Sequence, residues 1–183
     1  MPQVQPSGAP LMSLDEAIER LLEGARGHVI DEFEVVSTFD ALQRVLAQDV
    51  RSGLNVPPED NSEMDGYALR AADVAAAGIM LPVSQRIPAG QVGHGLRNGT
   101  AARIFTGAQI PPGADAVVMQ ELCDAIVPVR DGDLGSVRVR TVPTVGMSIR
   151  RRGEDVAFDA VVLRRGARIT PQAMGLAAAV GAA

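Results

Sequence analysis

The chain has 183 residues, of which 46% are hydrophobic and only 3% aromatic, so we expect a core of aliphatic side chains. Its formal net charge of −5 argues against a general nucleic-acid binder, because such proteins present a basic face. The single cysteine, Cys123, excludes an internal disulfide and a cysteine-based zinc site, and is expected to be a small core residue. No run reaches the roughly 18 apolar residues of a membrane span, and no secretory signal is present. These features indicate a cytoplasmic protein.

The N-terminal part is predicted to be mainly helical after a loosely structured tail. Ser13 and Glu16 have the spacing of a capping box, in which each satisfies an unpaired backbone donor of the first helical turn. Apolar residues then recur at helical spacing, until glycines end the pattern. Three elements are predicted here: a helix over 14–25, a strand over 28–36, and a second helix that starts at Ser37 and Thr38 and extends to Leu46.

The middle of the chain changes to short strand-like runs separated by Gly and Pro, which is typical of a small β-barrel or sandwich. Asp131-Gly132 between two such runs predicts a hairpin. A short helix is predicted over 70–78. The Gly-rich stretch 90–99 lacks the spacing of a dinucleotide-binding motif and is predicted to be a loop. The strands expected here are 81–87, 100–107, 114–121 and the two arms of the hairpin over 125–140.

The C-terminal part predicts two strand-like pieces and then a helix, which Thr170 caps and Pro171 opens. Because this apolar helix runs to Ala183 with no following partner, we expect a truncation there. Helices at the two ends and strands between them predict an α+β, β-rich fold. Its organisation is expected to be a β-barrel-like domain, residues 51–145, inserted into a discontinuous α/β lobe formed by residues 1–50 and 146–183.

Three segments carry residue types suited to binding chemistry. The acidic and amide side chains from Glu59 to Asp65 can ligate a hard cation such as Mg²⁺, although in a solvated turn they also cap their own backbone. Thr106-Gly107 follows a strand, where a glycine allows close approach of a ligand, but an ordinary turn looks the same. Arg150 to Arg152 suit an oxyanion, and the adjacent carboxylates Glu154 and Asp155 equally suit a salt-bridge network.

Four segments together resemble the N-terminal region of the molybdopterin molybdenumtransferases, the enzymes that insert molybdate into molybdopterin. They are LMSLDEAIERLL, PPEDNSEMDGYALR, GTAARIFTGAQIPPGADAVVMQE and SIRRRGEDV. Their order and spacing fit the family over nearly the whole chain. Two departures from the family pattern, Pro58-Glu59 and Gln109 to Pro112, lie beside the matching motifs and leave only the local loop shape in doubt.

The resemblance implies a cytoplasmic homodimer that acts on small-molecule substrates, adenylylated molybdopterin and molybdate, with Mg²⁺, and that releases AMP. The active cleft would lie between subunits, and other molybdenum cofactor biosynthesis proteins are expected partners. Neither nucleic acid nor membrane is expected to bind. The residues implied are Asp65, Thr106, Arg150 and Asp155 as catalytic positions, Gly107 and Arg151 as binding positions, and Asp65 with Asp155 as cation ligands.

The resemblance also implies that a pterin-binding α/β domain follows residue 183, so that this chain alone is expected to be inactive. Two alternatives stay open. One is a dimerising scaffold or interaction module of the gephyrin type, for which the apolar N-terminal helix and C-terminus are suited. The other is a stand-alone anion-binding or metal-binding β-domain.

Overall fold

The computed structural model describes residues 12–28, 30–127 and 132–182. They divide into two compact units, Met1–Val36 and Ser37–Ala183, which are described separately. Among the described residues, no helix combines the length and the apolar character needed to cross a membrane. The division of residues 51–145 from the two chain ends stays a prediction.

The first unit contains the predicted N-terminal helix, α1 (Leu14–Arg26). The Ser13 hydroxyl accepts a hydrogen bond from the Glu16 backbone N–H at 3.2 Å, which confirms the Ser13 half of the predicted capping box. The Glu16 carboxylate pairs with Arg20. The strand predicted over 28–36 is wrong, since residues 30–36 have no regular structure. Ile30 and Val35 are 87% and 93% exposed, and no strand of the described residues pairs with this segment to satisfy its backbone.

The second predicted helix is also wrong, because only one turn forms, the 3₁₀ helix η1 (Thr38–Asp40). Gln43 adopts a φ of 66°, a left-handed conformation that a helix cannot contain. Beyond it the chain is extended, and its N–H groups bond to a distant segment, as in Leu46 N to Ala167 O at 2.9 Å. The helix predicted over 70–78 is likewise reduced to the 3₁₀ turn η2 (Ala71–Asp73).

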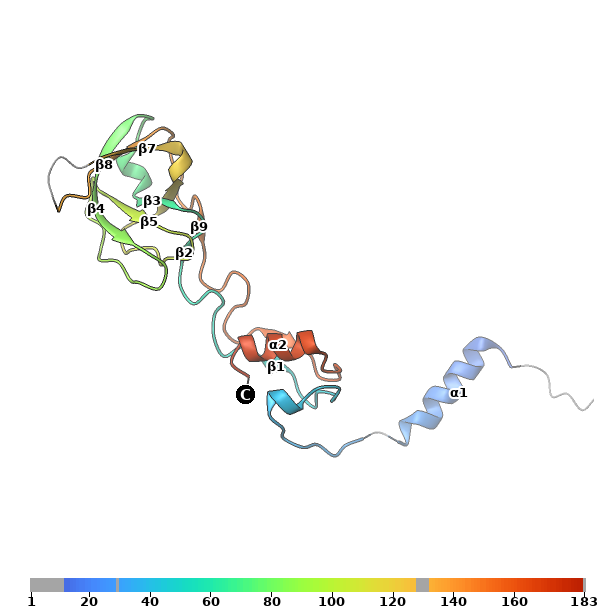
Figure 1. Cartoon of the computed structure of the whole chain (residues 1–183). Helices are drawn as coiled ribbons and strands as arrows, with labels where there is room; N and C mark the ends of the chain where they lie inside the picture. Colours follow the sequence, from blue (N-terminus) through green and yellow to red (C-terminus); the bar gives the residue numbers. More distant parts are fainter. Residues whose placement is uncertain (1–11, 29, 128–131, 183) are drawn as a thin grey trace, which may run out of the picture. The chain divides into compact units, whose positions relative to one another are not determined.

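Most strands of the second unit belong to one curled six-stranded sheet (Figure 1). Only the β4/β5 pair is parallel. The two edge strands, β6 and β7, follow each other in the chain through the 3₁₀ turn η3 (Gln120–Leu122), which brings the sheet edges towards each other. In spatial order the strands are β6 (Ala116–Met119), β3 (Gly66–Leu69), β5 (Ala101–Ile104), β4 (Ile79–Ile87), β8 (Ser136–Val139) and β7 (Cys123–Ile126).

This sheet confirms the β-rich fold class and the strands predicted for the middle of the chain. The β7/β8 pairing confirms the predicted hairpin, although residues 128–131 of its turn lie outside the described residues. Residues 91–97 contain neither helix nor strand, as predicted for the Gly-rich stretch.

The central strands are buried on both faces, because each face packs against its own apolar cluster. Tyr67, Leu69 and Val118 belong to one cluster. Ala68 and Val117, their neighbours in sequence, belong to the other. This arrangement explains why β3 and β6 read as continuous apolar runs rather than alternating ones. The second cluster also contains loop and β9 residues: Leu96, Ala108 and Ile149.

Cys123 at the start of β7 packs against the first cluster, as expected of a small core residue. Burial raises the pKa of its thiol to about 11, while the charge of Arg140 lowers it by less and the charge of Asp124 raises it further. At neutral pH the thiol is therefore protonated and a poor nucleophile.

The two ends of the second unit meet in a smaller assembly. β1 (Val50–Arg51) pairs antiparallel with β10 (Val161–Leu163). The predicted C-terminal helix forms as α2 (Pro171–Ala179), and the Thr170 hydroxyl accepts the Ala173 N–H at 3.2 Å. The helix packs against β10 and η1, and Val180 just after it is fully buried. Whether this assembly is the discontinuous α/β lobe of the prediction stays untested.

Candidate functional site

Three segments predicted from the sequence to carry chemistry meet at one side of the sheet. β2 (Asn61–Ser62) pairs antiparallel with β9 (Ile149–Arg150), so that Asn61 lies opposite Arg150. Ser62 also makes two backbone hydrogen bonds with the turn after β5. Its carbonyl accepts the Gly107 N–H at 2.8 Å, and its N–H donates to the Ala108 carbonyl at 2.9 Å. The acidic segment therefore lies between the Thr-Gly turn and the Arg-rich turn.

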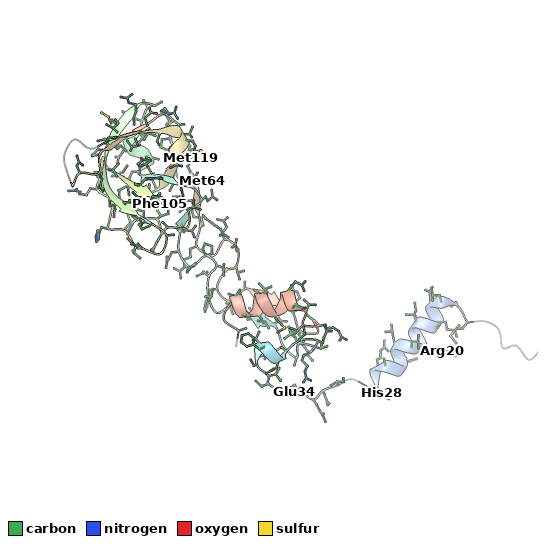
Figure 2. The ribbon with its side chains drawn as sticks, in the orientation of Figure 1. Arg20, His28, Glu34, Met64, Phe105 and Met119 are labelled. Carbon is green, nitrogen blue, oxygen red and sulfur yellow. The ribbon has the colours of Figure 1, made fainter. Side chains whose placement is uncertain are left out.

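Asp65 and Thr106 are in direct contact. The Asp65 Oδ1 atom accepts the Thr106 backbone N–H at 2.9 Å and the Thr106 hydroxyl at 2.8 Å. The sheet register imposes this contact, because Asp65 precedes β3, Thr106 follows β5, and Gly66 pairs with Ile104. Met64 and Phe105, the residues just before this pair, are labelled in Figure 2 at the same end of the sheet.

The Asp65 carboxyl is stabilised in its charged form. The Thr106 N–H lowers its pKa most, followed by the Thr106 hydroxyl, with a smaller contribution from the charge of Arg103. The side chain is half-buried, and its second oxygen, Oδ2, accepts no hydrogen bond from the described residues. Thr106 thus fixes an ionised carboxylate whose other oxygen has no hydrogen-bond partner among the described residues.

Arg103, which the sequence analysis missed, holds the backbone around this pair. Its guanidinium donates to the Gly66 carbonyl at 2.8 Å and to the Gln120 side-chain oxygen at 2.7 Å. The Gln120 backbone N–H in turn donates to the Asp65 carbonyl at 2.9 Å. A half-buried arginine inside the otherwise buried strand β5 was the available sequence signal, because such a charge needs several partners.

Arg150 and Asp155 form an ion pair within the Arg-rich turn. This hydrogen bond raises the pKa of Arg150, and the carboxylates of Glu154 and Glu63 add to the effect. The salt-bridge alternative left open by the sequence is therefore the arrangement that the structure contains. An oxyanion that bound Arg150 would have to displace or share the Asp155 carboxylate.

Asp60, which the sequence analysis placed among the possible cation ligands of the acidic segment, instead connects that segment to the Arg-rich turn. Its Oδ2 accepts the Arg151 guanidinium at 2.7 Å and its Oδ1 accepts the Arg152 backbone N–H at 2.8 Å. The Arg152 N–H lowers the Asp60 pKa most, and the Arg151 hydrogen bond and charge lower it further against the effect of burial. The Arg151 guanidinium is therefore hydrogen-bonded to Asp60, which is 91 residues away in the chain.

Gly107 has a φ of +80°, which favours glycine whatever surrounds it. A Cβ added to it would meet nothing within 4 Å. Its N–H is taken by Ser62 O. The glycine is therefore required here by backbone conformation and not by crowding inside the chain.

The residues expected to hold a cation fit that role only in part. Within residues 12–28, 30–127 and 132–182, no group of three His, Cys, Asp or Glu side chains is placed to hold a metal ion. Asp155 is paired with Arg150, which removes it as a ligand in this arrangement. Asp65 fits as one oxygen ligand, since Mg²⁺ is commonly bound by one or two carboxylates together with substrate phosphates.

A protein-family model described as the MoeA N-terminal region (domain I and II) matches residues 12–181. The chain is 46% identical over 144 residues to molybdopterin molybdenumtransferase 2 of Mycobacterium tuberculosis, covering 76% of this chain and 34% of that protein. It is 35% identical over 173 residues to the molybdopterin molybdenumtransferase of Haemophilus influenzae, covering 94% of this chain and 41% of that protein.

The structure is also similar to a solved one, the crystal structure of the molybdopterin biosynthesis moeA protein from Pyrococcus horikoshii OT3. The TM-score is 0.72 at 38% sequence identity, and the match covers 83% of this chain and 40% of that chain. The chain thus spans about two fifths of the length of the relatives that it matches.

Proposed function

The chain belongs to the MoeA N-terminal region family, and on this basis we propose that it supplies one wall of a site that inserts molybdate into adenylylated molybdopterin during molybdenum cofactor biosynthesis. Two relatives that carry the name molybdopterin molybdenumtransferase support the reaction class. The observation that carries the proposal is the convergence of the Asp65–Thr106 contact and the Arg-rich turn on the two sides of β2. AMP would be the second product.

In this proposal each implied residue has a separate task. Asp65 presents Oδ2 to Mg²⁺ or to one of its waters, while Thr106 keeps the carboxylate ionised and oriented. The ion, when bound, would neutralise charge on the substrate phosphates. Arg150 receives an oxyanion such as molybdate by exchanging Asp155 for it, and Asp155 holds the guanidinium in place beforehand. Gly107 and Arg151 shape the turns on either side.

We also propose that the protein acts as a homodimer in the cytoplasm, with other molybdenum cofactor biosynthesis proteins as partners. The apolar stripe of α1 supports an association, because four large side chains there are 45–76% exposed: Leu14, Ile18, Leu21 and Leu22. Exposing such an apolar stripe to water costs free energy. Burial of the stripe against a second copy of the chain removes this cost.

The 183 residues alone are proposed to release no AMP from adenylylated molybdopterin. The chain covers only 34–41% of the relatives named for the transferase activity, and of the two predicted cation ligands, Asp155 is paired with Arg150 in the described residues. Turnover by the purified chain at a rate above the buffer blank contradicts this part of the proposal.

The function is tested in the cells that encode the chain, by deleting its gene and measuring molybdopterin species and molybdoenzyme activity. The expected result is accumulation of adenylylated molybdopterin, loss of molybdoenzyme activity, and recovery of both when the gene is returned. Loss of activity with no accumulated adenylylated intermediate would place the protein at another step. Unchanged activity in a strain with no second copy of the gene would contradict the role altogether.

A further inference from the structure

A hollow of about 210 Å³ opens on the sheet apart from the Asp65–Thr106 contact. Its polar lining comes from four side chains: Tyr67, Arg86, Arg103 and Ser136. The remaining wall is apolar and is formed by Val83, Ala125, Ile126 and Leu134. Such a combination of apolar wall and a few converging polar groups is typical of a small-ligand site.

Two like charges are held together beside this hollow. Arg86 of β4 lies directly opposite Arg103 of β5 in the sheet register. Both guanidinium groups stack on the same ring, with their central carbon atoms 4.8 Å and 4.4 Å from the centroid of Phe105. Like charges at paired positions destabilise a sheet unless an opposite charge compensates them.

The two arginines differ in what already binds them. Arg103 donates to Gly66 O and Gln120, and its charge acts on the Asp65 carboxylate. Arg86 is exposed, and among the described residues its guanidinium has the ring of Phe105 as its contact, with no carboxylate within salt-bridge distance. Within the described residues, the positive charge of Arg86 therefore has no carboxylate partner, although the net charge of the chain is −5.

Two hydroxyl groups add to the donors at the hollow. Tyr67 is 7% exposed and Ser136 is half-buried, and neither side chain makes a hydrogen bond within the described residues. Hydroxyls and guanidinium groups are the donors that bind a tetrahedral oxyanion. The register of β4 shifts between Val83 and Gln85, which changes the alternation of side chains along this strand. Val83 and Arg86 therefore both line the hollow.

We propose that this hollow binds a phosphate monoester, with the phosphate on Arg86, Tyr67 and Ser136 and an apolar or planar group against the aliphatic wall. Arg103 also lines the hollow and adds positive potential while it keeps its hydrogen bond to the Gly66 carbonyl. The proposal goes beyond the molybdate-insertion role and does not require it, since binding is measured on the 183-residue chain without turnover.

The test is a titration of the ¹⁵N-labelled chain, followed by NMR amide shifts, with phenyl phosphate, inorganic phosphate, and sodium chloride at matched ionic strength. Phenyl phosphate is expected to give saturable shifts confined to the strands around the hollow, and to bind more tightly than inorganic phosphate. Arg86→Gln is expected to weaken binding by roughly tenfold or more, since it removes a charge-assisted hydrogen bond. Tyr67→Phe is expected to weaken it by a few fold.

The matched control is Arg97→Gln, which makes the same charge change in an exposed loop outside the hollow. It should bind phenyl phosphate like the unaltered chain, and thermal melting should show all three variants folded. Equal affinity of Arg86→Gln and the unaltered chain overturns the proposal, as do shifts that sodium chloride reproduces. Equal affinity for phenyl phosphate and inorganic phosphate overturns the ester part and assigns the hollow to free phosphate.

Discussion

At the scale of residues, the Asp65 carboxylate depends mainly on Thr106 for its low pKa, with a smaller contribution from Arg103. Thr106 contributes both hydrogen bonds, and the backbone one has the larger effect. Thr106→Val removes the hydroxyl and keeps the backbone N–H, so the Asp65 pKa should rise part of the way towards its ordinary value. A pH titration of the ¹³C-labelled carboxyl by NMR measures this change. An unaltered Asp65 pKa in the variant would show that the hydroxyl contact is absent in solution.

The pKa of Asp60 is also lowered, and such lowered pKa values make the free energy of unfolding depend on pH. The pKa values of Asp60 and Asp65 both lie below the ordinary value of 3.8, so the folded protein holds these two carboxylates ionised better than the unfolded chain does. Their contribution is complete above the unfolded pKa and is lost as the pH falls through the folded values. The urea midpoint should therefore fall from about pH 4 downwards.

Asp60→Ala should destabilise the chain by about 1 kcal/mol at pH 7, because it removes the partner of Arg151 and of the Arg152 N–H. It should also flatten the acid dependence of the urea midpoint. The control is Asp124→Ala, which removes a 3.4 Å surface ion pair with Arg140 and should cost under about 0.5 kcal/mol. Equal effects of the two substitutions would contradict the proposal that Asp60 stabilises the chain by connecting the acidic segment to the Arg-rich turn.

At the scale of elements, the approach of β3 to β6 requires a glycine. A Cβ on Gly66 would lie 2.1 Å from the Val118 carbonyl oxygen, a backbone atom of a paired strand. Gly66→Ala should therefore destabilise the chain by about 3 kcal/mol or more. Gly107→Ala meets open space and should cost only about 1–2 kcal/mol for its left-handed backbone. Urea denaturation checks both values, and a Gly66→Ala chain as stable as Gly107→Ala would contradict the strand geometry.

Five of the six strands of the sheet were predictable from short alternating or apolar runs near Gly and Pro, as in β5, whereas β3 was not predicted as a strand. The caps at Ser13 and Thr170 were predictable because they act within four residues. Three predicted elements are wrong: the strand over 28–36, the helix from Ser37 to Leu46 and the helix over 70–78. Helical spacing after Ser37 is overridden by hydrogen bonds to residues 167–169 and by the left-handed Gln43.

The candidate site, too, was predictable from the sequence only in part. The motifs identified its segments, and their meeting around β2 agrees with that choice. The Asp155 partner of Arg150 was among the alternatives that the sequence offered. The Asp60 partner of Arg151 could not be derived, because these two residues are 91 apart and Glu154 or Asp155 is nearer in the chain. Arg103 was missed because its partners include the carbonyl oxygen of Gly66, which carries no sequence signal.

At the scale of the whole molecule, the exposed stripe of α1 makes self-association testable. In the proposed dimer, Leu14 and Leu21 are buried from exposures of 76% and 74%. Leu21→Ser should then raise the dimer dissociation constant by about tenfold or more, since a buried leucine contributes about 2 kcal/mol. Sedimentation over a concentration series measures it. Glu23→Ser on the polar side is the control, and a monomeric unaltered chain at high concentration would contradict the dimer.

The central claim is that the Asp65–Thr106 contact belongs to a molybdate-insertion site. The most direct measurement is molybdoenzyme activity in the cells that encode the chain after Asp65→Asn is introduced at the gene, with Asp124→Asn as the control. We predict that Asp65→Asn lowers activity by at least about tenfold at unchanged protein abundance, with accumulation of adenylylated molybdopterin, while Asp124→Asn has no effect. Full activity of the Asp65→Asn strain would contradict the account.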